Sequence, residues 1–164
     1  MNLLKILLLL PFLLGEVSHY DCTTFYLIRH AEKVRNDKSE NNPDLNEKGI
    51  LRAQNWKNYF SDKQISKIYS TNYTRTLKTV YPLAIENGIE TLVYSASNIK
   101  YDDFIKSNTG ENTLVVGHSN TIPSFVNNLI NDEYYNQIED LNNSNLYIVS
   151  ICGSIITHKL IKVD

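Results

Sequence analysis

The sequence predicts an α/β fold: a three-layer sandwich with a mainly parallel sheet flanked by helices, and a C-terminal hairpin at the sheet edge. Two observations lead to this prediction. Short runs rich in β-branched and aromatic residues alternate with segments whose apolar residues recur at helical spacing. One run, 113–116, is largely apolar throughout, which is typical of a strand covered on both faces.

The first predicted strand covers 23–28, where threonine and aromatic residues are frequent. A polar loop follows over 33–46. Asn46, at the end of this loop, is expected to cap a helix, because its side chain can accept a hydrogen bond from a free backbone N–H. The apolar residues of that helix recur at helical spacing and are Ile50, Ala53, Trp56 and Phe60.

The second predicted strand covers 65–69, and Arg75 opens the helix that follows it. Pro82 lies inside this helix and is expected to kink or shorten it, because proline lacks a backbone N–H. Gly88 is expected to end it, because glycine readily adopts the left-handed conformation found after many helices. The apolar face of this helix is expected to carry Leu77, Val80, Tyr81 and Ala84.

The remaining elements continue the alternation and end in a hairpin. Pro123 fits the first turn of the last helix, where a missing N–H costs no hydrogen bond. A turn at Cys152-Gly153 joins the two hairpin strands. The expected ranges are 91–94 (strand), 101–106 (small helix), 113–116 (strand), 122–130 (helix), and 146–151 with 154–161 (hairpin).

The first residues of the chain have the pattern of a targeting segment. Lys5 precedes an apolar run over 6–14, which is too short and ends too abruptly to span a bilayer as a helix. We therefore expect residues 1–18 to be a signal peptide, and the protein to be exported to the periplasm or the extracellular space. Residues 23–164 are then enough for one domain with a full core.

The chain has two cysteines, Cys22 and Cys152. In an exported protein they could pair as a disulfide. Alternatively, Cys22 could carry a lipid anchor, because it follows the apolar run closely, although the three residues before it are not the small ones that lipidation favours. The number and spacing of the cysteines do not fit a zinc site.

The charge balance excludes some partners. The formal net charge is −2, whereas bulk nucleic-acid binding usually needs a strongly basic face. No nucleic-acid partner is therefore expected. No stable membrane span is expected either, because the apolar run over 6–14 is too short.

Three segments place cationic or imidazole side chains directly after predicted strands. They are Arg29-His30, Arg75, and Gly117-His118. The carboxyl ends of parallel strands lie at one edge of a sheet, where ligands bind in folds of this class. Two of the chain's four arginines and two of its four histidines are thus expected to meet there.

These residue types suit phosphoryl chemistry. The planar guanidinium of arginine binds phosphate oxygens and stays charged. A neutral imidazole is a nucleophile near pH 7 and can form a covalent phosphoryl intermediate. Helices that begin after Tyr73 and Ser119 would add backbone N–H donors.

In residues and order, the three motifs resemble the histidine phosphatase superfamily, also called phosphoglycerate mutase-like, and in particular its small bacterial phosphatases. The resemblance implies that His30 is the nucleophile, and that Arg29, Arg75 and His118 bind the phosphoryl oxygens. The family usually has glycine after the Arg-His pair, and here the residue is Ala31.

The general acid is the part of the site that the motifs do not fix. The family usually has an acidic residue between the second arginine and the second histidine. Asp102 and Asp103 follow the third predicted strand in that region and are the preferred candidates. Glu32, two residues after the nucleophile, is the rival. Glu32 and Asn120 are also expected to contact the substrate.

The preferred function is a phosphatase that hydrolyses phosphomonoesters or a protein-bound phosphate through a phosphohistidine on His30. Its partner would be a phosphorylated small molecule or a phosphoprotein, and no metal or cofactor is expected. The alternatives are a phosphoglycerate mutase-like phosphoryl transferase and a non-catalytic phosphate-binding module. A metallohydrolase using His30, Glu32 and His118 is disfavoured, because two nearby arginines would repel a divalent cation.

Overall fold

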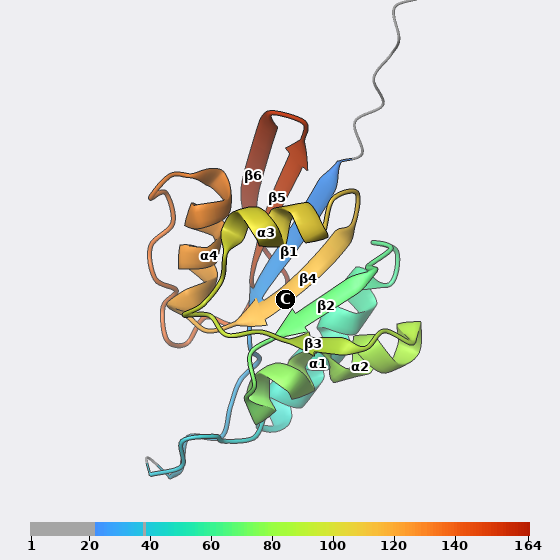
Figure 1. Ribbon diagram of the computed structural model, residues 1–164. Helices are drawn as coiled ribbons and strands as arrows, with labels where there is room; N and C mark the ends of the chain where they lie inside the picture. Colours follow the sequence, from blue (N-terminus) through green and yellow to red (C-terminus); the bar gives the residue numbers. More distant parts are fainter. Residues whose placement is uncertain (1–21, 38) are drawn as a thin grey trace, which may run out of the picture.

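The computed structural model describes residues 22–37 and 39–164, which form the predicted three-layer sandwich (Figure 1). The predicted signal peptide, 1–18, lies outside the described residues. The elements in order are β1 (Thr23–Arg29), α1 (Glu47–Phe60), β2 (Lys67–Ser70), α2 (Thr74–Asn87), β3 (Thr91–Val93), α3 (Tyr101–Ser107), β4 (Asn112–Gly117), α4 (Thr121–Ile130), β5 (Asn145–Cys152) and β6 (Ile155–Lys162).

The sheet is mainly parallel, with an antiparallel hairpin at one edge. Its strand order is β3-β2-β4-β1-β5-β6. The strands from β3 to β1 pair in parallel, and β5 runs antiparallel to both β1 and β6. The carboxyl ends of β1, β2 and β4 therefore lie together, as the motifs require.

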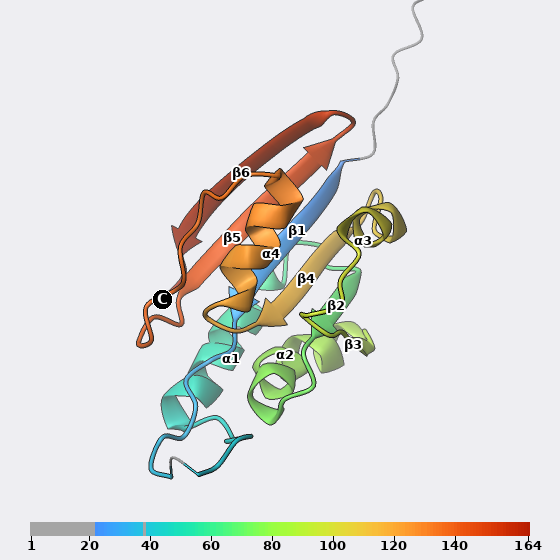
Figure 2. The ribbon, with the colours of Figure 1, turned by 60° about the vertical axis from the view of Figure 1, so that its left-hand side comes forward.

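Alternating side chains of the central strands build two cores, one on each face of the sheet. On β1, Ile28 faces the core formed with α1 and α2, and Leu27 faces the core formed with α4. Trp56 and Phe60 of α1 fill the first core, and Phe125 of α4 fills the second. Figure 2 shows α4 lying against β1 and β5. A sheet covered on both faces accounts for the apolar character of β4.

Helix boundaries follow local chemistry closely. The Asn46 side chain accepts a hydrogen bond from the Gly49 N–H at 2.9 Å and caps α1 as predicted. Gly88 ends α2 with a φ of 64°, also as predicted. Pro82 does not shorten the helix, although the sequence allowed for this, because α2 continues through it to Asn87. Buried Leu83, next to Pro82 in α2, helps to hold the helix against the sheet despite the missing hydrogen bond.

Two residues predicted for buried helix faces are exposed instead. Ile50 is 54% exposed and Tyr81 is 63% exposed. Gly49 takes the inner position on α1, where any Cβ would collide with the backbone of Glu32. The helical spacing was predicted correctly, but Ile50 and Tyr81 each lie one residue beyond a buried position, Gly49 on α1 and Val80 on α2.

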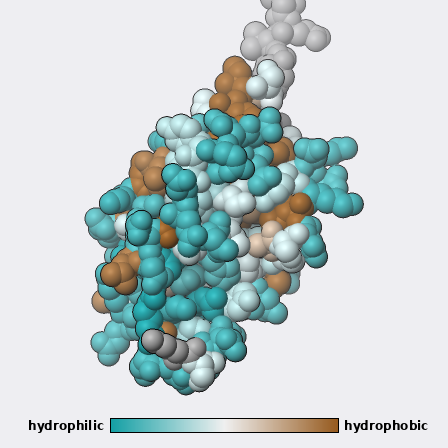
Figure 3. All heavy atoms as spheres, turned by 90° about the vertical axis from the view of Figure 1, so that its left-hand side faces the viewer, coloured by the Kyte–Doolittle hydropathy of each residue, from teal (hydrophilic) through white to brown (hydrophobic). Residues whose placement is uncertain are grey.

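The surface is mostly hydrophilic. On the face shown in Figure 3, apolar residues occur in small scattered groups among polar ones. No helix within 22–37 or 39–164 is long and apolar enough to cross a membrane.

A disulfide joins Cys22, just before β1, to Cys152 at the end of β5. The Cα atoms are 4.3 Å apart, although 130 positions separate the residues in sequence. Antiparallel pairing of β1 with β5 brings the two ends together, since Thr23 lies opposite Ile151. The Cys22 sulfur is therefore engaged in the disulfide, and it cannot at the same time carry the lipid considered above.

The disulfide closes a long loop, so its removal should destabilise the domain. We expect the double variant Cys22→Ser/Cys152→Ser to lose about 2–5 kcal/mol of unfolding free energy, because its unfolded chain is no longer constrained. Urea unfolding without reductant measures this loss. Reductant should lower the stability of the wild type and leave the double variant unchanged; equal midpoints for both proteins would contradict the prediction.

Candidate active site

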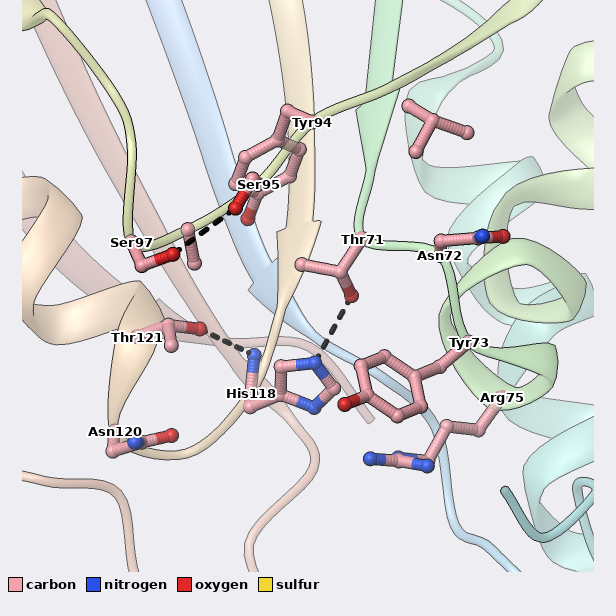
Figure 4. Close-up of a pocket in the computed structure, with 12 residues that line it drawn as sticks. Thr71, Asn72, Tyr73, Arg75, Tyr94, Ser95, Ser97, His118, Asn120 and Thr121 are labelled. Carbon is pink, nitrogen blue, oxygen red and sulfur yellow. Dashed lines mark hydrogen bonds between the residues drawn. The ribbon is translucent and has the colours of Figure 1, made fainter. Parts of the chain in front are cut away.

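An open cavity of about 1000 Å³ lies at the carboxyl ends of β2, β3 and β4 (Figure 4). The start of α2 and the start of α4 form two of its walls. A Cβ at Gly117, the last residue of β4, would lie 2.8 Å from the Thr121 hydroxyl and 2.9 Å from the Tyr94 hydroxyl, so a larger residue would force these side chains to shift. Three predicted site residues line the cavity: Arg75, His118 and Asn120.

His30 lies beside this cavity, immediately after β1. It is 4% exposed, and its ring is 5.6 Å from the His118 ring, centroid to centroid. Its Nδ1 lies 2.7 Å from the carbonyl oxygen of Ala31. A carbonyl oxygen only accepts, so Nδ1 carries the hydrogen and Nε2 keeps a free lone pair. The backbone is fixed as well, since Asn143 donates to the His30 carbonyl at 2.8 Å.

Burial keeps His30 neutral. Desolvation lowers the pKa of His30 to about 3; the charges of Arg29, Arg75 and His118 act in the same direction, while the hydrogen bond to Ala31 opposes them. At neutral pH the imidazole is therefore unprotonated at Nε2. It has the protonation state that a nucleophile needs.

His118 is held in the complementary tautomer by a chain of hydroxyls. Its Nε2 lies 3.0 Å from the Thr71 hydroxyl, and that hydroxyl donates to Thr76, which donates to the Thr71 carbonyl at 2.7 Å. The Thr71 hydroxyl thus donates its hydrogen to Thr76 and accepts a hydrogen bond from the Nε2–H of His118. Burial, followed by the charges of Arg75, Arg29 and Lys33, lowers the pKa of His118 to about 4.

Arg75 lies near the start of α2 with little to neutralise it. Its Cζ lies 4.3 Å from the centre of the Tyr73 ring, and one amino group contacts the Asn41 carbonyl at 3.5 Å. Its buried Nε has no hydrogen-bond partner, and Arg75 makes no ion pair with any residue in the described chain. Burial, then the charge of Arg29, lowers its pKa, against an opposing effect of Tyr73.

The motif predicts that Arg29 binds phosphoryl oxygens, but most of its hydrogen bonds go to the protein itself. Its NH1 group donates to the carbonyls of Glu139, Asp140 and Asn142 at 2.9–3.0 Å, and NH2 donates to the Asp140 carboxylate at 3.1 Å. The terminal amino groups thus hold the loop before β5. The Nε–H group is buried and unpartnered, so it is a donor left to meet a ligand.

The site carries more positive than negative charge. Asp140 is shared between Arg29 and Arg35, with its second oxygen 2.7 Å from Arg35. Burial lowers the pKa of Lys33, and the nearby charges of Arg75 and Arg35 lower it further. Two buried, unpartnered N–H groups and an excess of cations form a site for an anion.

The carboxylates proposed as general acids do not reach the cavity. Asp102 and Asp103 lie on the exposed first turn of α3 and border two other surface hollows, so that preference was wrong on position. Glu32 faces α1, where Arg52 Nε binds it at 2.8 Å and Lys48 at 3.3 Å. Burial favours its neutral form, but the hydrogen bond from Arg52 and further interactions outweigh it and lower the pKa of Glu32, so it stays ionised.

Four residues of the site were not singled out from the sequence: Thr71, Tyr73, Asp140 and Asn143. Thr71 and Tyr73 belong to the segment around Arg75, so their position after β2 was the available signal. Asp140 and Asn143 reach the site from over a hundred positions away in sequence. No pattern within a short stretch of sequence predicts such long-range contacts.

The metal hypothesis finds no ligand set in the described part of the chain. There, no three His, Cys, Asp or Glu side chains are grouped so that they could hold a metal ion. Glu32, one of the three residues named for it, is directed to α1 by Arg52.

Comparisons with known proteins agree with this geometry. The family model of the histidine phosphatase superfamily (branch 1) matches residues 25–96, which include Arg29, His30 and Arg75. A search of curated proteins by sequence found no match.

Solved structures share the fold at low identity. SixA from Agrobacterium tumefaciens is 19% identical, with a TM-score of 0.62 and coverage of 85% of this chain and 97% of that one. The protein histidine phosphatase SixA complexed with tungstate is 12% identical (TM-score 0.64, 85% and 96% covered). Phosphoglycerate mutase from Bacillus anthracis is 14% identical (TM-score 0.66, 87% and 93% covered).

Fold, site and family match together define the class of this protein as a phosphatase. Over residues 25–96 the chain is similar to the histidine phosphatase superfamily, whose family model matches this segment.

The depressed pKa of His30 has a consequence for stability. The unfolded histidine titrates near 6.5 and the folded one near 3, so between these values the unfolded state binds more protons and acidification favours unfolding. The His30→Asn variant keeps an N–H donor but does not titrate. Its unfolding free energy should therefore fall less steeply with decreasing pH, by up to about 1.4 kcal/mol per pH unit.

Urea unfolding of both proteins at about pH 7, 6 and 5 measures the difference in slope. The matched control is His158→Asn, which changes an exposed histidine on β6. It should leave the wild-type slope unaltered. Parallel slopes for wild type and His30→Asn would show that His30 is not held neutral by burial.

Proposed function

We propose that this protein is a phosphatase that works through a phosphohistidine on Nε2 of His30. One observation carries the proposal: a neutral buried imidazole, with its Nε2 lone pair free, lies beside two arginines whose Nε–H groups are buried and unpartnered. A phosphoryl dianion supplies acceptors for those donors and an electrophile for that nitrogen.

The residues divide the work as follows. Nε2 of His30 attacks phosphorus, and the bond from phosphorus to the leaving oxygen breaks. Arg75 and the Nε of Arg29 stabilise the charge on the equatorial oxygens. His118 lies against His30 and lines the cavity, beside the position proposed for the phosphoryl group. Water then attacks the phosphohistidine and releases inorganic phosphate.

The open cavity favours hydrolysis over retention of the phosphoryl group. The two longest connections beside the site, 30–46 and 131–144, contain no further helix or strand, and neither lines the cavity in the described chain. Water therefore reaches the phosphohistidine, which a mutase has to prevent. A mutase and a non-catalytic phosphate-binding module remain the alternatives, and the experiments below separate them from a phosphatase.

The same openness bears on the substrate. A cavity of about 1000 Å³ accommodates a phosphorylated small molecule or a phosphorylated side chain on a protein surface. The likeness to the protein histidine phosphatase SixA supports including phosphoproteins. We place the reaction outside the cytosol. The Cys22–Cys152 disulfide supports this location, because disulfides persist in oxidising compartments.

The nucleophile is tested by trapping the intermediate. We expect rapid alkaline quench with a phosphomonoester to leave phosphate on the peptide containing Arg29-His30. A phosphoramidate survives alkali but is labile in acid, so mass spectrometry after each treatment identifies the linkage. His30→Asn should carry no phosphate and lose turnover by orders of magnitude, whereas His158→Asn should behave as wild type. Phosphate on another residue would overturn the assignment of the nucleophile.

Arg75 tests electrostatic stabilisation. We expect Arg75→Ala to cost about 2–4 kcal/mol of transition-state stabilisation, a loss of roughly 30- to 900-fold in kcat/KM, as expected for losing one preorganised donor. Arg75→Lys should recover part of this loss, because lysine keeps the charge but not the planar fork.

Vanadate inhibition measures the anion site separately, and it should weaken in Arg75→Ala. The control is Lys78→Ala. Lys78 is a cation on the same helix, α2, but it pairs with Asp44. This variant should leave kcat/KM at the wild-type value. Tight vanadate binding by a wild type that hydrolyses no ester would instead favour the binding module.

A further inference from the structure

The site described so far lacks a proton donor for the leaving group. An alkoxide leaves phosphorus readily only if a proton reaches it. No carboxylate lines the cavity in the described part of the chain. Glu32 is paired with Arg52, and Asp140 is shared by two arginines, so both are held ionised and directed elsewhere.

Tyr73 occupies the position where such a donor would be useful. It is the last residue before α2, and its ring meets the His118 ring edge-on at 5.1 Å, centroid to centroid. Figure 4 shows its hydroxyl directed into the cavity beside His118. Tyr73 is 40% exposed, and its hydroxyl makes none of the hydrogen bonds found within the described chain.

Arg75 lies directly against the Tyr73 ring. Its guanidinium lies over the Tyr73 ring, 4.3 Å from the ring centre. A cation at this distance interacts favourably with the ring, and more strongly once the phenol has become a phenolate. The same arginine can thus bind the phosphoryl group and stabilise the conjugate base of the donor.

The second tyrosine and the histidine of the cavity have committed their protons. The Tyr94 hydroxyl donates to the Val116 carbonyl at 3.2 Å, and burial raises its pKa. His118 donates its Nε2 hydrogen to Thr71. With a pKa near 4, it carries no second proton at neutral pH.

We propose that Tyr73 is the general acid of this site, protonating the leaving oxygen as His30 attacks phosphorus; the assignment rests on the proposed function. In the first step the N–P bond forms, the P–O bond breaks, and the phenol proton moves to the leaving oxygen, which gives an alcohol and a phenolate. In the second step water attacks phosphorus, the phenolate takes a proton from the water, and the N–P bond breaks. Inorganic phosphate is released, and neutral His30 and the phenol of Tyr73 are regenerated.

The test is the dependence of rate on leaving-group basicity. Wild type and Tyr73→Phe are compared on a series of phosphate monoesters that runs from nitrophenyl through phenyl to alkyl phosphates, using kcat/KM, which reports on the first chemical step. A nitrophenolate leaves without a proton and an alkoxide does not. Tyr73→Phe should therefore lose about 10²–10⁴-fold on alkyl esters and little on nitrophenyl phosphate.

Tyr94→Phe is the matched control, because it removes the other tyrosine hydroxyl of the cavity. The dependence of its rate on leaving-group basicity should match that of the wild type. An equal loss by Tyr73→Phe on all esters, with or without weaker vanadate inhibition, would overturn the proposal and assign Tyr73 to packing or binding. An unchanged rate on alkyl esters would also overturn it and leave the phosphatase assignment intact. Failure of the proposed function is a different result, namely a wild type without phosphohistidine or turnover on any ester.

Discussion

The positive charge buried at the carboxyl end of the sheet constrains every other feature of the site. Arg29 is 3% exposed, and a buried guanidinium without partners would cost several kcal/mol. The fold supplies it with three carbonyl oxygens and half of a carboxylate. Arg75 receives only an aromatic ring and one long contact. The charge left uncompensated is balanced when a dianion enters, so binding and catalysis draw on the same imbalance.

Neutral histidines are consistent with this constraint. Burial is the main reason that both imidazoles stay unprotonated, and repulsion of an imidazolium by two nearby guanidinium groups adds to it. Each imidazole fixes its tautomer through one acceptor. For His30 the acceptor is a carbonyl on Nδ1, and for His118 it is a threonine hydroxyl on Nε2. The two rings therefore present different nitrogens, which supports the proposal that His30 is the nucleophile and that His118, without a second proton, does not protonate the leaving group.

The sequence predicted the strand and helix order, the caps at Asn46 and Gly88, and the meeting of Arg75 with His118, because each rests on local pattern or on the geometry of parallel strands. The general acid could not be predicted in the same way. Asp102 and Asp103 have a suitable position in the chain, but the connection from β3 turns them to the outer surface of α3. Pairings such as Glu32 with Arg52, or Arg29 with the loop before β5, depend on tertiary contacts that spacing does not encode.

The antiparallel strand β5 explains why the loop before it became part of the site. A parallel neighbour of β1 would bring its carboxyl end to the cavity, whereas β5 brings its amino end, with Leu146 opposite Ile28. The residues just before β5 therefore pass the end of β1, where Arg29 and His30 project, and Asp140 and Asn143 bind them there. The same strand direction carries Cys152 to the start of β1 and to Cys22. One strand thus fixes β1 at both ends, through a covalent bond at one end and buried charge at the other.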